Sequence, residues 1–301
     1  MKNNTISIVV ASDNHYAILI GALLKSIEVN HKSGEPIDFY IIDDGISEKN
    51  KRKIESSKIS DQITVKWFEK KSIIPQGMSI PVDKSAFPLT TYLRLFAPYA
   101  LAEDVERMIY LDVDTVVMTD ISLLWNTDLQ GSVIGAVLDL GKNVACEWGG
   151  IPNYKELGLA PDTKYFNAGI MLIDVLKWRE QNISSKVINA LQVHAKHVVL
   201  VDQYGLNVVF ANKWQELDPK WNWFATNYTA TPNIIHYLDI KPIFKSYHSQ
   251  EEYRVLFYEF LNQTPWKGFT PISDRHRVIR KFSNKIKKQV LNFFQAKTAE
   301  S

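Results

Sequence analysis

Two aspartates stand one residue apart at the end of an apolar run. Residues 107–111 read Arg-Met-Ile-Tyr-Leu and lead straight into Asp112, Val113 and Asp114. Such a run predicts a buried strand, and carboxylates at the turn after it can share one hard cation as ligands. A cation at this point could hold a diphosphate and stabilise it as a leaving group. Turn aspartates without a ligand are the simpler alternative, but carboxylates inside apolar sequence need neutralisation.

The elements that must position these carboxylates alternate along the chain. Short runs rich in β-branched residues are separated by stretches in which apolar residues have helical spacing. This alternation predicts an α/β fold with a mostly parallel central sheet and helices on both faces. Ligands bind such sheets at the carboxyl ends of the strands, so Asp13 and Asp112 are expected at one crevice. The predicted strands are residues 6–10, 37–42, 62–68, 108–111, 133–138, 168–174 and 234–237, the predicted helices are residues 16–29, 89–99, 175–181, 184–194 and 203–210, and residues 70–88 and 214–223 are predicted loops.

The composition is that of an ordinary globular protein. The chain has 301 residues, a net charge of +2 and 46% hydrophobic residues, which excludes a disordered or fibrous chain. Cys146 is the only cysteine, so an internal disulfide is excluded and a reducing compartment is expected. The sequence shows no signal peptide and no apolar run near the roughly 20 residues of a membrane span. We therefore expect a cytoplasmic protein.

A set of short motifs follows in a fixed order along residues 6–245. The motifs are Ala11-Ser12-Asp13-Asn14-His15-Tyr16, Thr90-Thr91-Tyr92-Leu93-Arg94-Leu95, Tyr110-Leu111-Asp112-Val113-Asp114, Leu123-Leu124-Trp125, Phe166-Asn167-Ala168-Gly169, Asp202-Gln203 and His236-Tyr237. On this ordered set the chain resembles the family 8 glycosyltransferases, most closely the bacterial lipooligosaccharide and lipopolysaccharide α-galactosyltransferase and glucosyltransferase type. The resemblance implies a GT-A fold, which is the Rossmann-like fold of nucleotide-diphospho-sugar transferases. It also implies that residues 1–270 form the catalytic domain.

The resemblance also implies a reaction. It is the retaining transfer of a hexose from UDP-galactose or UDP-glucose to a glycan or glycolipid acceptor, in lipopolysaccharide or other surface-glycan biosynthesis. A nucleotidyltransferase is an alternative, but it would need a basic, phosphate-gripping loop, and the turn at residues 11–16 has no Gly-rich run and no Lys. A non-catalytic sugar-nucleotide or glycan-binding protein is a second alternative. It would be expected to lack Asp112, Asp114 or Gln203, and all three are present.

A metal and nucleotide site is implied by the same resemblance. Asp112, Asp114 and His236 would be the ligands of Mn²⁺, with Mg²⁺ as an alternative, and mixed carboxylate and imidazole ligation suits Mn²⁺. A strand-end histidine with a structural partner is the simpler role for His236. Asp13 could instead cap the next helix, and Arg94 could form an ion pair on a helix surface. The residues implied to contact the nucleotide are Ala11, Asp13, His15, Tyr16, Arg94, Asp112, Val113, Asp114, His236 and Lys241.

The sugar side is implied to consist of Asp139, Asn167, Ala168, Asp202 and Gln203. An amide is a poor nucleophile, so we expect Gln203 to stabilise an oxocarbenium-like state while the acceptor attacks from the front face. Asp202 is the next candidate, as the nucleophile of a double displacement, and Asp139 is the third candidate catalytic residue. Each acid or amide also has a simpler structural role: a turn acid for Asp139, an Asx-turn for Asn167 and an N-cap for Asp202.

The chain departs from the family pattern near His236. Asp239 stands where the family often has Gly, Ile243 replaces a Trp, and the loop from His236 to Pro242 is one residue shorter. His15 stands where close relatives often have Asn. An acid at position 239 is compatible with a diphosphate beside Lys241 only if its side chain turns away.

Residues 271–301 are expected to form a basic amphipathic tail. Residues 275–295 contain seven Lys or Arg and no acid. Such a helix can lie on an anionic membrane surface, which predicts peripheral attachment to the inner face of the plasma membrane, and a helix docked on the domain is the alternative. The basic residues have no accompanying RNA- or DNA-binding motif, so nucleic acid is not an expected partner. The apolar positions that recur every fourth residue are Val278, Phe282, Ile286, Val290 and Phe294.

Overall fold

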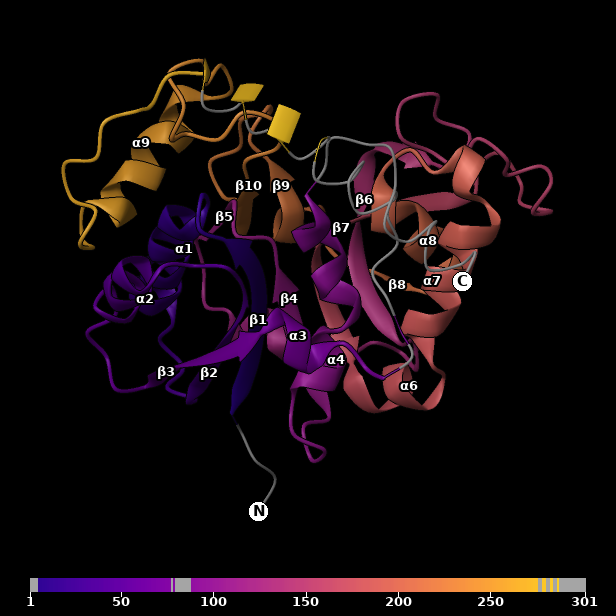
Figure 1. Cartoon of the computed structure of the whole chain (residues 1–301), viewed down its shortest axis with the longest axis horizontal. Coiled ribbons are helices and arrows are strands. Elements are labelled where there is room, and N and C mark those ends of the chain that lie inside the picture. Colours follow the sequence, from indigo (N-terminus) through magenta and orange to yellow (C-terminus); the bar gives the residue numbers. More distant parts are fainter. Residues whose placement is uncertain are drawn as a thin grey trace.

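The central feature of the structure, a computed structural model, is a seven-stranded sheet with strand order β3-β2-β1-β4-β7-β6-β8 (Figure 1). The structure describes residues 5–76, 78, 88–275, 278–279, 282–283 and 286. Neighbouring strands run parallel except at β7, which is antiparallel to β4 and β6. The predicted α/β fold with a mostly parallel sheet is therefore confirmed. The strands are β1 (Ile6–Asp13), β2 (Ile37–Asp44), β3 (Ile63–Glu69), β4 (Arg107–Leu111), β6 (Ile134–Asn143), β7 (Lys164–Asp174) and β8 (Gln215–Glu216).

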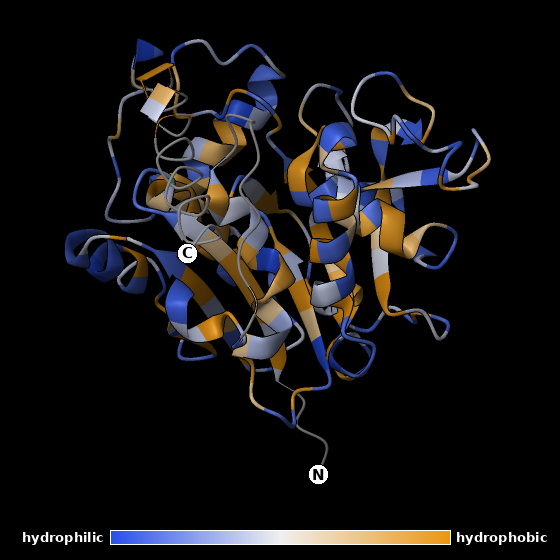
Figure 2. Cartoon of the chain, turned by 45° about the vertical axis from the view of Figure 1, so that its right-hand side comes forward, coloured by the Kyte–Doolittle hydropathy of each residue, from blue (hydrophilic) through white to orange (hydrophobic). Residues whose placement is uncertain are grey.

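Both faces of the sheet are buried. Along β1, Ile8 and Val10 belong to one hydrophobic cluster, whereas Val9 and Ala11 belong to another. Successive side chains of a strand point to opposite faces, so the apolar run of β1 suits burial on two sides. Figure 2 shows hydrophobic residues along the strands and hydrophilic residues in the outer loops. The first cluster contains residues of α1 (Ala17–Asn30) and α9 (Glu251–Leu261), and the second contains residues of η1 (Leu89–Leu95), α6 (Val175–Glu180), α7 (Ile183–Val193) and α8 (Val201–Phe210).

A small second sheet stands at the carboxyl end of β4. Its strand order is β5-β10-β9, with β5 at Thr115–Val117, β10 at Ile234–His236 and β9 at Trp223–Phe224. β5 follows β4 after a turn of residues 112–114. The end of β10 is therefore held beside that turn. The remaining helices are α2 (Glu48–Glu55), α3 (Lys70–Ile73), α4 (Ala97–Ala100), α5 (Ser122–Trp125), η2 (Ala195–His197) and η3 (Pro219–Asn222).

β7 departs from regular pairing at the same edge of the sheet. Ala136 of β6 pairs with Met171, but the next residue, Val137, pairs with Asn167. Residues 168–170 therefore form a bulge in β7. Leu111, the last residue of β4, pairs with Ile170, so the bulge lies at the carboxyl end of β4. Bulges re-aim backbone and side-chain groups and are common beside active sites.

Three predicted site residues lie inside elements rather than at their ends. β6 continues to Asn143, so Asp139 does not follow the strand. Asn167 lies within β7, which begins at Lys164. Asp202 lies in the first turn of α8 and is not its N-cap. Polar residues can continue these elements because their side chains bond to partners brought in by other elements. Three other predicted segments also differ. Residues 89–99 form η1 and then α4, the predicted loop 70–88 begins with α3, and the predicted loop 214–223 contains β8 and η3.

Ordered packing continues a few residues past the predicted domain end at residue 270. Ile272 bridges to Phe244, and Ser246 Oγ donates to the Asp274 carboxylate.

Within the tail, the described side chains of Val278 and Phe282 are exposed. Among the described residues, no helix is both long and apolar enough to cross a membrane. Most of the tail, with Val290, Phe294 and every Lys and Arg beyond Arg275, and residues 77 and 79–87 of the predicted 70–88 loop lie outside the described residues.

Candidate active site

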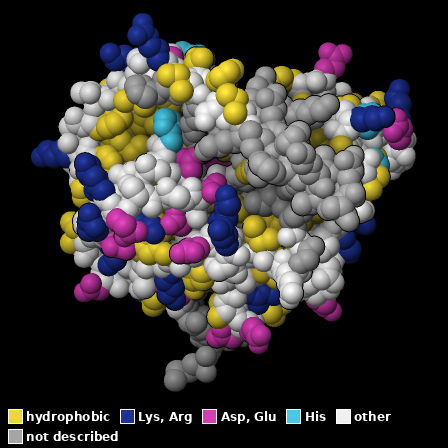
Figure 3. All heavy atoms as spheres, in the orientation of Figure 1, with side chains coloured by type: hydrophobic (Ala, Val, Ile, Leu, Met, Phe, Trp, Pro, Cys, Tyr) yellow, Lys and Arg dark blue, Asp and Glu magenta, His cyan; other side chains and the backbone are white. Residues whose placement is uncertain are grey.

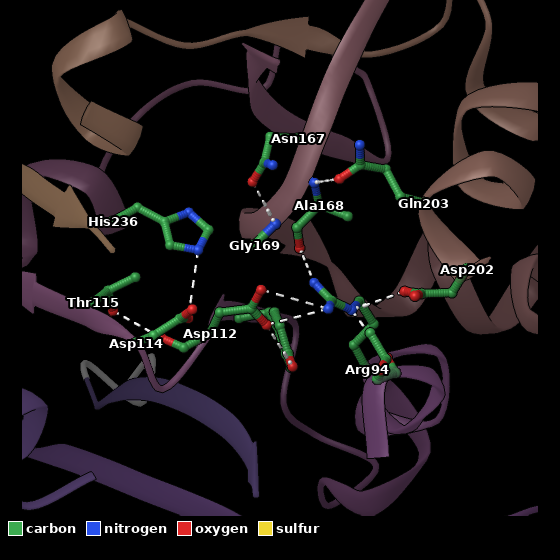
Figure 4. A network of polar contacts seen from close by, with 12 residues as sticks. Arg94, Asp112, Asp114, Thr115, Asn167, Ala168, Gly169, Asp202, Gln203 and His236 are labelled. Carbon is green, nitrogen blue, oxygen red and sulfur yellow. Dashed lines mark hydrogen bonds and ion pairs between the residues drawn. The ribbon is translucent and has the colours of Figure 1, made fainter. Parts of the chain in front are cut away.

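The turn between β4 and β5 holds Asp112 and Asp114, and His236 ends β10. Pairing of His236 with Thr115 across the small sheet brings the imidazole to this turn. One ligand atom from each of the three residues lies within 4.8 Å of the others, and His236 Nε2 is 3.4 Å from Asp114 Oδ1 (Figure 4). Thr115 Oγ1 donates to the Asp112 carbonyl at 2.8 Å and fixes the turn. The three residues predicted to bind a metal are therefore gathered at one point.

The two aspartates of this turn differ in their electrostatic surroundings. Burial raises the pKa of Asp112, and the Arg94 guanidinium only partly counters this effect. Burial would also raise the pKa of Asp114, but Lys241 and His236 outweigh burial and lower it. Lys241 Nζ forms an ion pair with Asp114 Oδ2. The negative charge of the turn is thus balanced by cationic side chains, as carboxylates that are partly withdrawn from water require.

Arg94 bridges Asp112 of this turn to the carboxylate of Asp202. Its Nη2 is 3.2 Å from Asp112 Oδ1 and its Nε is 2.8 Å from Asp202 Oδ2. Its Nη1 donates to the Ala168 carbonyl. Burial would lower the pKa of Arg94, but Asp112 and Asp202 raise it overall. The Arg94 side chain is only 6% exposed, so the alternative of an ion pair on a helix surface is wrong.

Gln203 lies at the centre of a second polar network. Its Oε1 accepts from the Ala168 backbone N–H at 3.0 Å, and its Nε2 donates to Asp139 Oδ2 at 2.6 Å and to Tyr165 Oη at 3.4 Å. Asn167 Nδ2 lies 3.5 Å from Asp139 Oδ1. The bulge in β7 makes this possible, because it turns the Ala168 N–H toward Gln203 and the Ala168 carbonyl toward Arg94 (Figure 4).

Gly169 separates the two networks and leaves no space for a side chain. A Cβ at this position would lie 2.5 Å from His236 Cε1, 2.9 Å from Asn167 Oδ1 and 2.9 Å from Asp112 Oδ2. The Gly169 carbonyl also accepts from the Asp112 N–H at 2.7 Å. Glycine is required here because the imidazole and the carboxylate both approach the backbone closely.

If this cluster binds Mn²⁺, as the family resemblance implies, Gly169→Ala should displace His236 and Asp112 and weaken that binding about tenfold, the scale seen when the supports of metal ligands are disturbed. Titration of the protein with Mn²⁺ and UDP, followed by electron paramagnetic resonance of the free ion, measures the change. Gly135→Ala is the matched control, because its Cβ would meet the side chains of Leu129 and Leu217 at 2.8 and 3.0 Å, away from this cluster. Equal Mn²⁺ affinity in Gly169→Ala and the wild type would contradict the expectation.

Some of the residues predicted to contact the nucleotide lie near the carboxyl end of β1. β1 lies beside β4, with Val9 opposite Tyr110, so Asp13 and Asp112 emerge at the same edge. Asp13 Oδ1 accepts from the backbone N–H groups of His15 at 3.0 Å and Tyr16 at 3.3 Å. Asp13 thus shapes the turn before α1, but the N-cap of this helix is Tyr16 and no side chain caps it, so the alternative of Asp13 as the helix cap is wrong. Figure 3 shows acidic and histidine side chains beside an apolar hollow on this face, near β10 and α1.

The shortened loop after His236 has a left-handed residue at Asp239. Its φ is +55°, in the region that favours glycine and that Asp tolerates better than most residues. This conformation explains why a Gly suits the position, and the Asp239 side chain is exposed. Lys241 contacts Asp114 and donates to the Tyr237 carbonyl at 2.8 Å.

Several residues that support the site were not singled out from the sequence. Tyr110 Oη donates to Asp112 Oδ1 at 3.2 Å. Asn207 bonds to the backbone of Phe166 and Gln203 and so fixes α8 against β7. Asn222 bonds to both His236 and Asn167. A tyrosine in a strand and an asparagine in a helix have no distinctive local pattern, and only the tertiary contacts reveal their place.

The architecture and its site define the class of protein. The structure resembles the crystal structure of the galactosyltransferase LgtC in complex with donor and acceptor sugar analogues, with a TM-score of 0.71 and 25% identity over 87% of this chain and 99% of LgtC. The protein therefore has the GT-A fold of a glycosyltransferase. Residues 7–250 match the model of Glycosyl transferase family 8. The chain belongs to this family and is a glycosyltransferase.

Two relatives of known sequence are similar over most of their length. General stress protein A of Bacillus subtilis is 29% identical over 288 residues, which cover 88% of this chain and 96% of the relative. The lipopolysaccharide 1,2-glucosyltransferase of Escherichia coli is 26% identical over 277 residues, which cover 86% of this chain and 78% of the relative. Similarity to the family thus extends well beyond the short motifs.

Proposed function

We propose that this protein is a metal-dependent, retaining hexosyltransferase. It transfers galactose or glucose from the UDP-sugar to a glycan or glycolipid acceptor in the synthesis of lipopolysaccharide or another surface glycan. The observation that carries the proposal is the buried Arg94, which joins the cluster of Asp112, Asp114 and His236 to Asp202 beside Gln203. The names of the Escherichia coli glucosyltransferase and of LgtC support hexose as the transferred group.

The proposed metal ligands are Asp112, Asp114 and His236. Two carboxylates and one imidazole suit Mn²⁺, whereas Mg²⁺ favours an all-oxygen site. The close grouping of these ligand atoms supports the fit. Lys241 lowers the pKa of Asp114 and so keeps this ligand ionised. A bound Mn²⁺ would stabilise the charge that develops on the departing diphosphate. Lys241 would supply a further positive charge on the diphosphate side.

The nucleotide and the sugar would occupy opposite sides of this cluster. Tyr16 would stack on the uracil ring, and Asp13 would accept its N–H. The other proposed contacts of the nucleotide are Ala11, His15, Arg94 and Val113. On the sugar side, the proposed residues are Asp139, Asn167, Ala168, Asp202 and Gln203. The hydrogen bonds that join Asp139, Asn167, Ala168 and Gln203 support a common role for them.

The buried ion pair of Asp202 favours front-face transfer. Asp202 Oδ2 is 2.8 Å from Arg94 Nε, and the Asp202 side chain is 1% exposed, so using it as a nucleophile would break a buried pair. In the front-face reaction, the acceptor hydroxyl bonds to the anomeric carbon on the side from which UDP departs. Its proton passes to the departing phosphate oxygen. The Gln203 amide, held by Asp139 and Ala168, would stabilise the positive charge on the sugar ring.

A panel of UDP-sugars tests this function. The full-length protein is incubated with each UDP-sugar and Mn²⁺, without and with glycan acceptors, and released UDP is measured. We expect UDP release from UDP-galactose or UDP-glucose, and none after chelation of the metal. Reaction products that contain pyrophosphate would instead support the nucleotidyltransferase. Binding of the UDP-sugar without formation of any product would support the non-catalytic binding protein.

The tail is proposed to attach the enzyme to anionic membrane. Each basic residue near anionic lipid contributes on the order of 1 kcal/mol at low salt, and the exposed Val278, Phe282 and Ile286 would add interfacial burial. Because Ser246 bonds to Asp274, a truncation after Arg275 preserves the packed part. We expect this truncation to leave UDP-sugar hydrolysis unchanged and to abolish co-sedimentation with anionic vesicles.

A second variant separates charge from burial. Phe282→Ser combined with Ile286→Ser keeps every basic residue, so it should weaken vesicle binding while preserving its dependence on salt. Neutral vesicles serve as the control surface. If the truncated protein unfolds or loses hydrolysis, the tail is a docked structural element and attachment to the membrane by this route is wrong.

A further inference from the structure

A buried asparagine links the metal side of the site to the sugar side. Asn222, 2% exposed, ends η3. Its Oδ1 lies 2.9 Å from His236 Nδ1, and its Nδ2 lies 2.9 Å from Asn167 Oδ1. One amide therefore touches a proposed metal ligand with its oxygen and a proposed sugar contact with its nitrogen.

The orientation of this amide follows from a backbone group. Gly169 N–H donates to Asn167 Oδ1 at 2.9 Å, and a backbone N–H can only donate. Asn167 Oδ1 is therefore an acceptor, so Asn222 must turn its Nδ2 toward Asn167. The Oδ1 of Asn222 then faces His236 Nδ1, which must carry a proton to bond with it.

This chain of bonds selects the tautomer of His236. A neutral imidazole has one N–H and one lone pair, so a proton on Nδ1 leaves the lone pair on Nε2. Nε2 is the atom on the side of Asp114, at 3.4 Å from Asp114 Oδ1. A metal-binding histidine commonly donates its other ring N–H to an oxygen that fixes its tautomer and orientation.

The local fold holds Asn222 rigidly in this place. Asp218 accepts from the Lys220 N–H at 2.8 Å, and Pro219 begins the helix. The Asn233 N–H donates to the Lys220 carbonyl at 2.9 Å and ties η3 to the start of β10. Trp223, the next residue, pairs with Ile235 of β10. Asn222 and His236 are thus fixed to one another by backbone bonds.

We propose that Asn222 is a positioning residue that holds His236 with Nδ1 protonated and Nε2 ready to bind the metal, and that also fixes Asn167 on the sugar side. This inference rests on the proposed function, because it concerns the same metal site. It assigns different tasks to the two ends of one side chain. The oxygen serves the metal ligand, and the nitrogen serves the sugar contact.

Two substitutions separate these tasks. Asn222→Leu keeps the volume but removes both hydrogen bonds, so it should weaken Mn²⁺ binding in the presence of UDP by about 10- to 100-fold. Asn222→Asp keeps an acceptor for His236 Nδ1 but loses the donor to Asn167. It should keep Mn²⁺ affinity near that of the wild type and lower the kcat of UDP-sugar hydrolysis with little change in KM for the UDP-sugar.

The matched control is another buried amide that contacts a histidine. Asn153 is 3% exposed, and its Nδ2 lies 3.3 Å from His194 Nδ1. Asn153→Asp should leave Mn²⁺ binding unchanged. Equal Mn²⁺ affinities in Asn222→Leu and the wild type would overturn the inference. Equal weakening in Asn222→Leu and Asn222→Asp would also overturn it, because a general packing role would then explain both.

The tautomer can be measured without metal or substrate. In protein labelled with ¹⁵N-histidine, the long-range ¹H–¹⁵N spectrum at alkaline pH distinguishes the two neutral forms, and His236→Gln assigns the signal. We expect a proton on Nδ1 in the wild type, and a proton on Nε2 would overturn the inference even if Asn222→Leu failed to fold. Conversely, absence of Mn²⁺ binding by the wild type would count against the proposed function while this tautomer result stands.

Discussion

Asp112→Asn is expected to lower UDP-sugar turnover about a thousandfold, because loss of one metal ligand removes several kcal/mol of charge stabilisation from the departing diphosphate. Asp114→Asn should be equally inactive. The two differ in stability, since Asp114→Asn leaves the largely buried Lys241 without its counter-charge, whereas Arg94 keeps Asp202 as a partner after Asp112→Asn. Turnover is measured as UDP release, and stability as the midpoint of thermal unfolding.

Asp120 supplies the matched control for removal of a carboxylate. Its carboxylate accepts from the backbone N–H groups of Lys32, Ser33 and Ser122. Asp120 follows the carboxyl end of β5, whereas Asp112 and Asp114 precede the amino end of this strand. Asp120→Asn should therefore destabilise the fold and leave turnover of the folded protein unchanged. Full wild-type activity in excess EDTA, or normal turnover by Asp112→Asn, would rule out a metal-dependent reaction at this turn.

The sequence predicts the ends of the parallel strands well. An apolar run of β-branched residues marks a strand, and the first polar residues after it mark the edge where ligands bind. For this reason the positions of Asp13 and Asp112 could be foreseen. His236 could be assigned only through the family resemblance, because its place beside Asp114 depends on the pairing of β10 with β5.

The sequence could not predict the features that depend on how strands pair and on contacts between distant segments. Asp139 follows an apolar run, but β6 continues past it to Asn143, and the Asp139 carboxylate accepts from Gln203 of α8. The bulge at residues 168–170 leaves no local pattern, since it exists only relative to β6. Asn222 lies among tryptophans that suggest a packed loop. Its function depends on two partners, from β7 and β10, that are distant in the sequence.

Gln203→Ala is expected to lower kcat about a hundredfold, the scale seen when one preorganised electrostatic group is removed from a reacting centre. UDP affinity should change little, because the amide bonds to Asp139 and the Ala168 N–H and not to the proposed nucleotide contacts. A loss in kcat without a matching loss of UDP binding indicates an interaction made in the transition state. Steady-state UDP release gives kcat, and calorimetric titration with UDP and Mn²⁺ gives the affinity.

The structure also predicts how Gln203 variants differ from one another. Gln203→Ala removes the partner of Asp139 Oδ2 and of the Ala168 N–H, which costs about 1–3 kcal/mol of stability. Gln203→Glu would set a second carboxylate within hydrogen-bond distance of Asp139 Oδ2, now 2.6 Å from the amide, so a trapped glycosyl-enzyme in that variant would only show that a carboxylate there reaches the anomeric carbon. Gln215→Ala, on β8 outside the networks, is the control for removing a glutamine. If Gln203→Ala loses UDP affinity as strongly as kcat, Gln203 contacts the nucleotide and its proposed role on the sugar side is wrong.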